Sequence, residues 1–405
     1  MSLSLLALCA WTVLLLLPSQ PHRTRERLAP GEAAVALRDV TVLIPARNEA
    51  AMIEKTLDAL REQGPELEII VVDDGSDDGT ARVCRDIAGR LRRPTGAAAP
   101  SRSSGDERRG RPSGPAGEVC QQAGTRLRVI EGKPLPTGWG GKLWALEQGL
   151  AEVARPYTLL LDADIVLAPG MIAALLARAR DPDQGAVLVS IMARLRCAGF
   201  WERLLVPPFV FFFKLLYPFA RVNGRRSAVA AAAGGCVLVE TSVLREVGAF
   251  ASFKDSLIDD CALARRVKGR GYAIWLGLSH SVRSTRAYAK LDDFWEMVSR
   301  TAFTQLGYST AALLLTSGAM AVGFAVPIVA VLLGPGWVPV VGLLTLAAMV
   351  LAVVPVIRFY GLSWLWALAM PLAAGLYLLM TWSSALRYWR GTRATWKNRA
   401  YEVVD

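Results

Sequence analysis

Residues 68–80 read EIIVVDDGSDDGT, an apolar run that ends in a series of carboxylates and glycines. The β-branched residues of the run are typical of a buried strand, and Asp73 and Asp74 follow at its carboxyl end. Ligands of open α/β sheets bind at that edge, so the pair is a candidate binding site. An ordinary Asp/Gly turn with Ser76 and Asp77 as capping residues explains the same residues equally well.

Similar apolar runs recur along the polar part of the chain and predict an α/β domain with a largely parallel sheet. The expected strands are residues 40–44, 68–72, 127–130, 157–161, 186–191 and 236–239. Between the first two, Ile53, Leu57 and Leu60 recur at helical spacing and predict a helix with one apolar stripe. Residues 94–117 are rich in Pro, Gly, Ser, Ala and Arg, and we expect them to form a disordered insertion.

Two stretches near the C-terminus are apolar enough to lie in a membrane. Hydrophobic residues make up 53% of the 405 residues, and neither 301–357 nor 359–386 contains an Asp, Glu, Lys or Arg. Such lengths predict about three transmembrane helices. We expect these helices at residues 311–334, 338–357 and 362–386.

Two further apolar segments lie outside this region. Residues 3–17 have no basic residue before them and several Arg after them. That pattern favours an uncleaved anchor, with its carboxyl end facing the cytoplasm, over a cleaved signal peptide. Residues 204–220 are rich in Phe but contain Pro207, Pro208 and Lys214. They predict either a helix in the membrane interface or an ordinary core helix.

The formal net charge of +11 comes mostly from Arg-rich runs beside apolar segments, including residues 22–27 and 387–399. This placement favours an anionic inner leaflet over nucleic acid, for which the sequence holds no motif. We therefore expect a multi-pass protein of the inner (cytoplasmic) membrane with its polar domain in the cytoplasm. Three C-terminal crossings would nevertheless put residues 387–399 outside, so either one segment is re-entrant or the boundaries are wrong.

The cysteine and histidine content restricts the chemistry. Six cysteines are scattered without a Cys-x-x-Cys pair, and His22 and His280 are the two histidines. This pattern argues against a thiolate zinc site and makes Ser–His or Cys–His nucleophilic catalysis hard to assemble. Carboxylates are left as the catalytic groups, and any metal would be held mainly by oxygen ligands.

Asp162 and Asp164 stand one residue apart at the end of the expected strand 157–161. Two carboxylates in this arrangement can bind Mg²⁺ or Mn²⁺ that bridges two phosphates. An isolated Asp-x-Asp is a weak signal because acidic loop residues are common. A second pair of carboxylates after another strand strengthens it.

Two other groups of residues are less specific. Residues 138–142 read GWGGK and offer backbone N–H groups and a cation, which can hold a pyrophosphate or simply form a turn. Asp259 and Asp260 begin an expected helix. Acidic residues are favoured there by the helix dipole, and the same carboxylates can serve as a general base.

Taken together and in order, these residues resemble the family 2 glycosyltransferases, whose nucleotide-sugar domain has the Rossmann-like GT-A fold. The resemblance runs over about residues 40–300 and rests on 45–49 (PARNE), 71–80 (VVDDGSDDGT), 141–146 (GKLWAL), 162–164 (DAD) and several residues between Gly234 and Asp260. The expected units are an anchor at 1–20, a GT-A domain at 38–300, transmembrane helices at 306–390 and a basic cytoplasmic or peripheral tail at 391–405.

The resemblance also implies roles for individual residues. The donor-binding residues would be Pro45, Arg47, Glu49, Asp73, Asp74, Lys142 and Asp162. Asp164 would be the main metal ligand, with Asp162 beside it. Asp260, next to Asp259, would be the catalytic base of an inverting transfer. The acceptor side would include Gly234, Gly235, Cys236 and Arg300.

Processive members of the family carry Gln-x-x-Arg-Trp near the first C-terminal membrane helix. Residues 297–301 read MVSRT, with the Arg but without the Gln and the Trp. This departure favours the transfer of a single sugar. The order of an anchor, an α/β domain and several C-terminal helices is similar to the ceramide glucosyltransferase-like and hopanoid-associated branch.

We therefore expect a membrane glycosyltransferase of glycolipid biosynthesis that uses a nucleotide-sugar, a UDP-sugar being favoured, with Mg²⁺ or Mn²⁺. The acceptor would be a lipid related to hopanoids. In one alternative, a polyprenyl-phosphate glycosyltransferase, Arg283, Arg286 or Arg300 would hold the acceptor phosphate. A nucleotidyltransferase and a noncatalytic membrane scaffold are two others. No nucleic-acid partner is expected, and the sequence identifies no protein partner.

Overall fold

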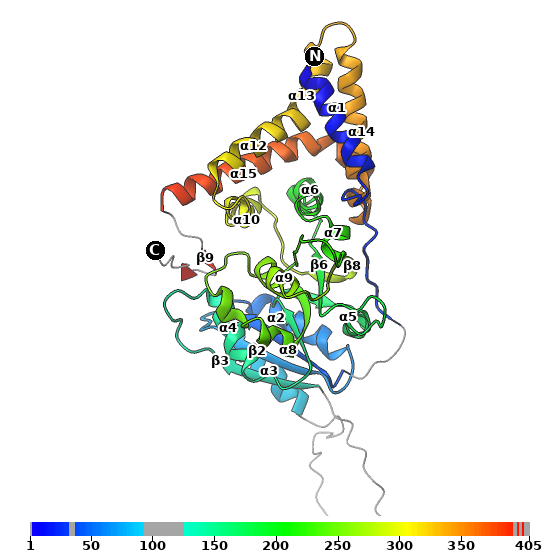
Figure 1. Ribbon diagram of the computed structural model, residues 1–405. Helices are drawn as coiled ribbons and strands as arrows, with labels where there is room; N and C mark the ends of the chain where they lie inside the picture. The colour runs from blue at the N-terminus through cyan, green and yellow to red at the C-terminus, as the bar shows by residue number, and fades with distance from the viewer. Residues whose placement is uncertain (1, 32–36, 93–124, 392–394, 397–398, 401–405) are drawn as a thin grey trace, which may run out of the picture.

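The computed structural model of the chain describes residues 2–31, 37–92, 125–391, 395–396 and 399–400. An α/β domain forms one end of the molecule and a group of apolar helices forms the other (Figure 1). The insertion expected at residues 94–117 lies outside the described residues.

The domain is built on an eight-stranded sheet in the order β3-β2-β1-β4-β7-β6-β8-β5. Its strands are β1 (Val40–Ala46), β2 (Glu68–Asp73), β3 (Arg126–Glu131), β4 (Tyr157–Leu161), β5 (Ile165–Leu167), β6 (Leu188–Arg194), β7 (Cys236–Glu240) and β8 (Ile274–Ser284). β1, β2, β3 and β4 run parallel, as do β6 and β8. β7 runs against β4 and β6, and β5 runs against β8. The sheet is therefore mixed rather than largely parallel.

Each of the six expected strands overlaps an observed one, but β5 and β8 were not expected from the sequence. β5 has only three residues. β8 begins with a short apolar run at residues 274–278 but places Ser279, His280 and Ser281 in its second half. Two hydrophobic clusters cover the opposite faces of the sheet, with Leu43 in one and Val42 in the other. Burial on both faces explains why the central strands read as unbroken apolar segments.

Helices cover both faces of this sheet. They are α2 (Ala50–Arg61), α3 (Thr80–Arg92), α4 (Gly141–Leu150), α5 (Met171–Ala179), α7 (Phe219–Asn223), α8 (Thr241–Glu246), α9 (Asp259–Gly269) and the 3₁₀ turn η1 (Phe250–Phe253). The expected stripe is confirmed, because Ile53, Leu57 and Leu60 of α2 are fully buried.

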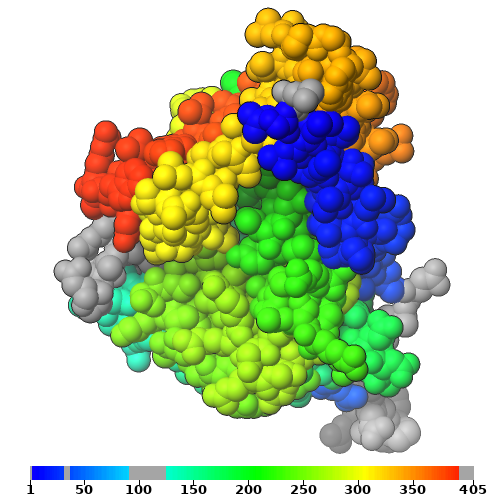
Figure 2. Space-filling model, turned by 45° about the horizontal axis from the view of Figure 1, so that its top comes forward, coloured from blue at the N-terminus to red at the C-terminus, as the bar shows by residue number. Residues whose placement is uncertain are grey.

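The apolar end contains α1 (Ser2–Leu16), α12 (Thr310–Met320), the π-helical η2 (Ala321–Ala325), α13 (Val326–Leu333), α14 (Val338–Phe359), the 3₁₀ turn η3 (Trp364–Ala369) and α15 (Met370–Trp389). Three helical stretches, Thr310–Leu333, Val338–Phe359 and Trp364–Trp389, are long and apolar enough to cross a membrane, as expected. The shorter α1 lies against the α13–α14 hairpin (Figure 2). It is fixed there by Trp11, whose ring N–H donates to the carbonyl of Gly323 at 2.9 Å.

The end of α14 and the end of the last apolar helix both lie beside the α/β domain. After α14, Arg194 of β6 donates to the carbonyl of Tyr360 at 3.1 Å. At the end of α15, Arg387 pairs with Glu296 of α10 (Leu291–Ser299) at 2.7 Å. The turn between α13 and α14 lies at the opposite end of the helical group (Figure 1). The end of α14 and the end of α15 therefore both lie on the domain side of the helices.

Two helices lie between the sheet domain and the membrane-type helices. α6 (Phe200–Leu216) contains Pro207 and Pro208 and is contacted by α14 and α15, and Tyr377 of α15 donates to the carbonyl of Leu205 at 2.8 Å. α10 packs beside it and is followed by the short α11 (Ala302–Gln305). The Phe-rich segment is thus a helix covered by apolar helices on one side and by the domain on the other. A short pair, β9 (Thr395–Trp396) and β10 (Arg399–Ala400), follows α15.

Candidate active site

Carboxylates from three regions of the chain converge at one edge of the sheet. Parallel strands end at the same edge, so the loops after β1 and β4 lie together. The first turn of α9 faces the same place. Glu49, Asp162, Asp164, Asp259 and Asp260 line a cleft of about 550 Å³ between the domain and helices α6 and α10. The structure thus brings together most of the predicted donor, metal and catalytic residues.

The loops after β1 and β2 are tied to each other. Arg47 donates to the carbonyl of Asp74 and also pairs with its carboxylate at 3.8 Å. The backbone N–H of Asn48 donates to Ser76 at 3.0 Å, and Ser76 donates to Asp73 at 2.5 Å. Asp73, Asp74 and Arg47 are not among the described residues that line the cleft. Their role in donor binding stays a prediction. The contacts in the structure connect the loops after β1 and β2.

Asp164 is the centre of a buried network that spans the sheet. Ser284 at the end of β8 donates to its Oδ2 at 2.6 Å, and Arg286 lies 3.4 Å from the same oxygen. Arg286 also pairs with Glu49 at 2.6 Å. Burial lowers the pKa of Arg286, but the two carboxylates outweigh burial and raise it above its usual value. The guanidinium therefore stays charged and holds the ends of β1 and β4 together.

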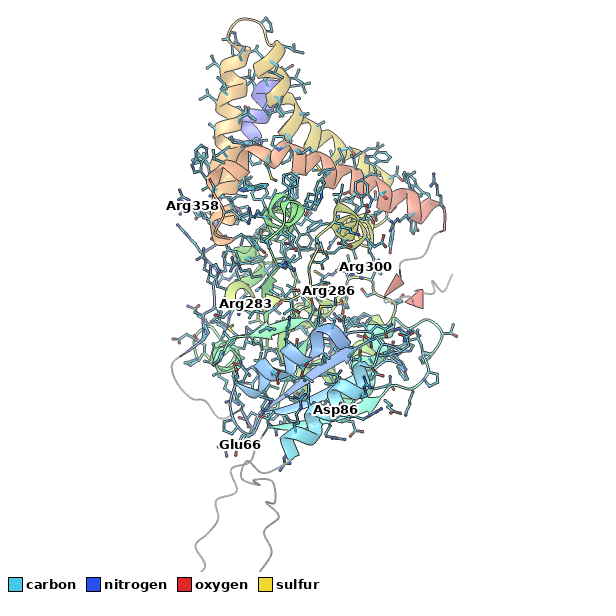
Figure 3. The ribbon with its side chains drawn as sticks, turned by 180° about the vertical axis from the view of Figure 1, so that it is seen from behind. Glu66, Asp86, Arg283, Arg286, Arg300 and Arg358 are labelled. Atoms are coloured by element: carbon cyan, nitrogen blue, oxygen red, sulfur yellow. The ribbon has the colours of Figure 1, made fainter. Side chains whose placement is uncertain are left out.

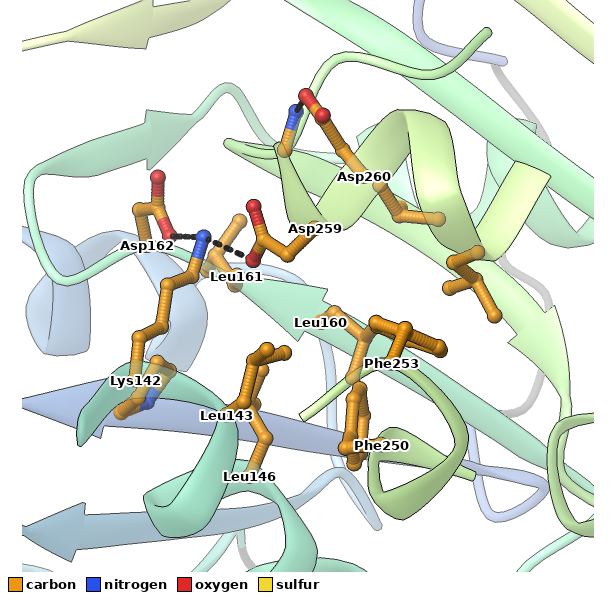
Figure 4. A pocket seen from close by; sticks show the side chains of 14 residues that line it. Lys142, Leu143, Leu146, Leu160, Leu161, Asp162, Phe250, Phe253, Asp259 and Asp260 are labelled. Atoms are coloured by element: carbon orange, nitrogen blue, oxygen red, sulfur yellow. Dashed lines mark hydrogen bonds and ion pairs between the residues drawn. The ribbon is translucent and has the colours of Figure 1, made fainter. Parts of the chain in front are cut away.

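Lys142 connects the strand-end carboxylates to α9. It stands in the first turn of α4, after Gly140 as the N-cap, and its Nζ lies 3.1 Å from both Asp162 and Asp259 (Figure 4). Burial opposes its charge, yet Asp162 and Asp259 raise the pKa of Lys142 well above its usual range. The glycine-rich segment thus supplies a cation to the carboxylate cluster, where a diphosphate would also need one.

Asp260 is held rigidly by backbone donors. Its Oδ2 accepts from the N–H of Gly234 at 2.7 Å and its Oδ1 from the N–H of Cys261 at 2.6 Å. A side chain at Gly234 would place a Cβ 3.2 Å from Oδ2, so the glycine permits this approach. Burial and the neighbouring Asp259 raise the pKa of Asp260 to about 6. A carboxylate with this pKa is ionised near neutral pH and is still basic enough to accept a proton.

The residues at the strand end fit a hard divalent cation only in part. Among the described residues, no three His, Cys, Asp or Glu side chains are grouped as a complete metal site. Mg²⁺ and Mn²⁺, however, need only one or two carboxylates when a diphosphate and water supply the other oxygens. Asp162 and Asp164 provide those carboxylates, and both line the cleft. The donor set thus fits a cation that arrives together with a diphosphate.

The opposite wall of the cleft is apolar along α6 and mostly charged along α10. Phe209, Val210 and Phe213 of α6 line it, and Met297 lies among Asp293, Glu296 and Arg300 at α10. Gly234 and Gly235 line the cleft below this wall, whereas Cys236 is fully buried in β7. Their role on the acceptor side stays a prediction.

Sequence reasoning did not assign Ser284 to the site and considered Arg286 only as a cation for an acceptor phosphate. Both contact Asp164. Tyr288 also lines the cleft, and burial raises its pKa to about 12. The polar residues at the end of β8 could have indicated these contacts, but the sequence pattern did not reveal β8 as a strand.

Two family models and a curated relative match parts of this chain. The model for glycosyl transferase family 2 matches residues 41–96, and the model for glycosyl transferase family 21 matches residues 123–405. A curated relative, 4,4'-diaponeurosporenoate glycosyltransferase of Staphylococcus haemolyticus, is 39% identical over 54 residues. That match covers 13% of this chain and 14% of the relative, so the chain spans about a seventh of that protein.

Solved structures share the fold. The mannosyltransferase PcManGT from Pyrobaculum calidifontis, solved with GDP-Man and Mn²⁺, has a TM-score of 0.55 and 18% identity, and the match covers 97% of this chain and 99% of that one. Glucosyl-3-phosphoglycerate synthase from Mycobacterium tuberculosis, solved with Mn²⁺ and uridine-diphosphate-glucose, has a TM-score of 0.39 and 20% identity over 70% and 87% of the two chains. The match to the mannosyltransferase confirms the GT-A arrangement expected from the sequence.

Proposed function

Because the chain belongs to glycosyl transferase family 21, whose model matches residues 123–405, we propose that it transfers one sugar at a time from a nucleotide-sugar to a membrane lipid with inversion. The observation that carries this proposal is the cleft between the domain and helices α6 and α10. Its floor is formed by carboxylates and two cations, and the α6 side of its opposite wall is apolar. A charged donor and an apolar acceptor each find a matching surface there.

The donor half would use the strand-end residues. Pro45 and Glu49 line the cleft beside the β1 and β2 loops, where a nucleoside would lie. Lys142 would face the diphosphate. Asp164 and Asp162 would hold Mg²⁺ or Mn²⁺, which supplies neutralisation of the leaving diphosphate when bound. A UDP-sugar is our preferred donor, on the resemblance of the donor-site motifs.

The transfer step would depend on Asp260. An acceptor hydroxyl attacks the anomeric carbon, its proton passes to the Asp260 carboxylate, and the bond from that carbon to the diphosphate oxygen breaks. Attack from the face opposite the leaving group inverts the anomeric centre. The two backbone N–H donors on Asp260 support this role because they fix the base in one orientation.

The acceptor would be a lipid alcohol that enters from the membrane side. Phe209, Phe213 and Met297 line the cleft on helices that lie under α14 and α15. A hopanoid-related acceptor is our specific proposal, supported by the similar order of anchor, domain and C-terminal helices. A polyprenyl phosphate is the second candidate, because Arg300 lines the cleft and forms no ion pair within the described part of the chain.

We place the protein in the inner membrane with the domain in the cytoplasm. Arg358 ends α14, and Arg387 and Arg390 end α15, all on the domain side. If α15 lies along the membrane surface rather than crossing it, every basic helix end stays cytoplasmic and the charge conflict of three crossings disappears.

Release of nucleoside diphosphate from a panel of UDP- and GDP-sugars tests the proposal. Purified protein in detergent is assayed with Mn²⁺ or EDTA, and with a neutral lipid extract, a polyprenyl phosphate or no lipid. Release that needs both metal and neutral lipid, and that Asp164→Asn abolishes, supports the proposal. Stimulation by polyprenyl phosphate alone selects the second candidate. Release of pyrophosphate instead would point to a nucleotidyltransferase, and an inactive folded protein with every donor would favour a scaffold.

A further inference from the structure

A second cavity, of about 460 Å³, lies beside the active-site cleft and is lined by four basic side chains. They are Lys55 of α2, Arg194 at the end of β6, Arg196 just after that strand, and Arg283 near the end of β8. No Asp or Glu is among the described residues that line it. Its volume is in the range of small-ligand sites. The cavity is thus suited to an anion, whereas the active-site cleft is lined by carboxylates.

Two of these cations have no ion-pair partner in the part of the chain that the structure describes. Among the described residues, neither Lys55 nor Arg283 forms an ion pair, and both are exposed. Arg196 lies 4.0 Å from Glu202, but that carboxylate already accepts two backbone N–H groups at the start of α6. Ser284 and Thr285 also line the cavity, but their hydroxyl groups already donate to Asp164. A phosphate group would therefore meet mainly the uncompensated positive charge of Lys55 and Arg283.

The cavity lies at the level where the chain passes from the domain to the membrane-type helices. Arg194 donates to the carbonyl of Tyr360, directly after α14, and its guanidinium lies 5.8 Å from the Tyr360 ring. Figure 3 shows Arg283 on the part of the domain below the end of α14, where Arg358 is labelled. The basic lining therefore lies next to the end of a membrane-type helix.

Exposed apolar side chains flank the same region. Phe200 at the start of α6 and Trp364, Leu365 and Leu368 of η3 are each more than half exposed. Phe200 lies 5.9 Å from the ring of Trp366, so the start of α6 and η3 form one surface. Aromatic residues beside basic ones are typical of the membrane–water interface. A ligand in the cavity would therefore have its charged part among the cations and its apolar part beside this surface.

We propose that this cavity binds the headgroup of an anionic phospholipid and so anchors the domain at the membrane surface beside the active site. The cavity shares Leu195 and Ser284 with the active-site cleft, but none of the carboxylates of that cleft lines it. A negatively charged leaflet supplies such headgroups, and each basic residue near the surface adds to the attraction.

The test is binding of dihexanoyl phosphatidylglycerol to the full chain in neutral detergent, with dihexanoyl phosphatidylcholine and inorganic phosphate as comparisons. We expect saturable binding of the phosphatidylglycerol, and binding that is weaker by roughly tenfold or more in the Lys55→Gln/Arg283→Gln variant. The matched control is Arg82→Gln/Arg226→Gln, which removes two other exposed cations without ion pairs in the described chain and should bind like the wild type.

Equal binding by the two double variants, or equal binding of both lipids, would overturn the proposal. Inorganic phosphate that binds as well as the anionic lipid would overturn the lipid assignment. Both readouts are made without a sugar donor, so they do not depend on the proposed transferase activity. As a measurement that needs no variant, wild-type affinity for the anionic lipid should fall as salt rises, and a salt-independent affinity would also count against the site.

Discussion

Replacing Asp260 by Asn tests the proposed general base with little change of shape. In the wild type its oxygens accept from the N–H groups of Gly234 and Cys261 at 2.7 and 2.6 Å. Asn keeps one acceptor oxygen but cannot take a proton from the acceptor. General-base catalysis contributes about 10²- to 10⁴-fold, so kcat/KM should fall by that factor, about 3–5 kcal/mol of activation free energy.

The same substitution should change stability far less than activity. Burial and Asp259 raise the pKa of Asp260 from 3.8 to about 6, so its ionised form costs the folded state about 3 kcal/mol at most at pH 7. Asn removes that cost, but its NH₂ group would face one of the two backbone N–H donors and cost about 1–3 kcal/mol. The two effects oppose each other, and the free energy of unfolding should change by less than about 2 kcal/mol.

The pH dependence gives an independent signature. Only the ionised carboxylate can accept a proton, so wild-type kcat/KM should fall about tenfold per pH unit below about 6. The residual activity of the Asn variant should lack this limb. Because the folded-state pKa is raised, the contribution of Asp260 to stability is favourable at low pH and is lost as pH rises from about 4 to 6.

The assay is nucleoside diphosphate release with saturating metal and lipid, over a series of pH values, together with thermal unfolding of each variant. Asp255→Asn is the matched control, because Asp255 is an exposed carboxylate near the start of the same helix with no hydrogen bond or ion pair in the described structure. If the Asp260→Asn variant keeps activity within about threefold of the control, or keeps the acid limb, Asp260 is not the base.

Lys142→Met should shift the acid limb to higher pH, because this cation lowers the pKa of Asp260; a pH profile unchanged from wild type would contradict that coupling. Arg286→Gln removes a cation that lies 3.4 Å from Asp164 and would repel a metal ion there. The Mn²⁺ concentration for half-maximal activity should therefore fall several-fold. A metal titration that shows weaker Mn²⁺ binding in this variant would contradict this repulsion. Glu202→Gln should lower the free energy of unfolding by about 1–3 kcal/mol at pH 7 through the loss of charged acceptors for backbone N–H groups. Those N–H groups outweigh burial and lower the pKa of Glu202. Thermal unfolding should therefore show that the stability difference between wild type and variant shrinks as pH falls below about 4.

The sequence by itself determined the features that depend on neighbours along the chain. Apolar runs that are buried on both faces predict the central strands, and acidic residues directly after a run are placed at the sheet edge by chain continuity alone. Asp162 and Asp164 could thus be located from the apolar run that precedes them, and both line the cleft. The apolar C-terminal helices follow in the same way, because length and the absence of charge determine which segments can cross a membrane.

Only the tertiary structure decided which of these groups meet. The direction of β7 depends on strands far away in sequence, so local pattern does not reveal it. Arg286 and Glu49 are 237 residues apart and still pair, and Lys142 reaches both β4 and α9. An ion pair of this kind forms only after non-local strands have brought its members within a few ångströms, and no spacing along the chain encodes that distance. The same holds for α15, whose composition predicts a crossing helix, while Arg387 at its end pairs with Glu296 of α10 on the domain side.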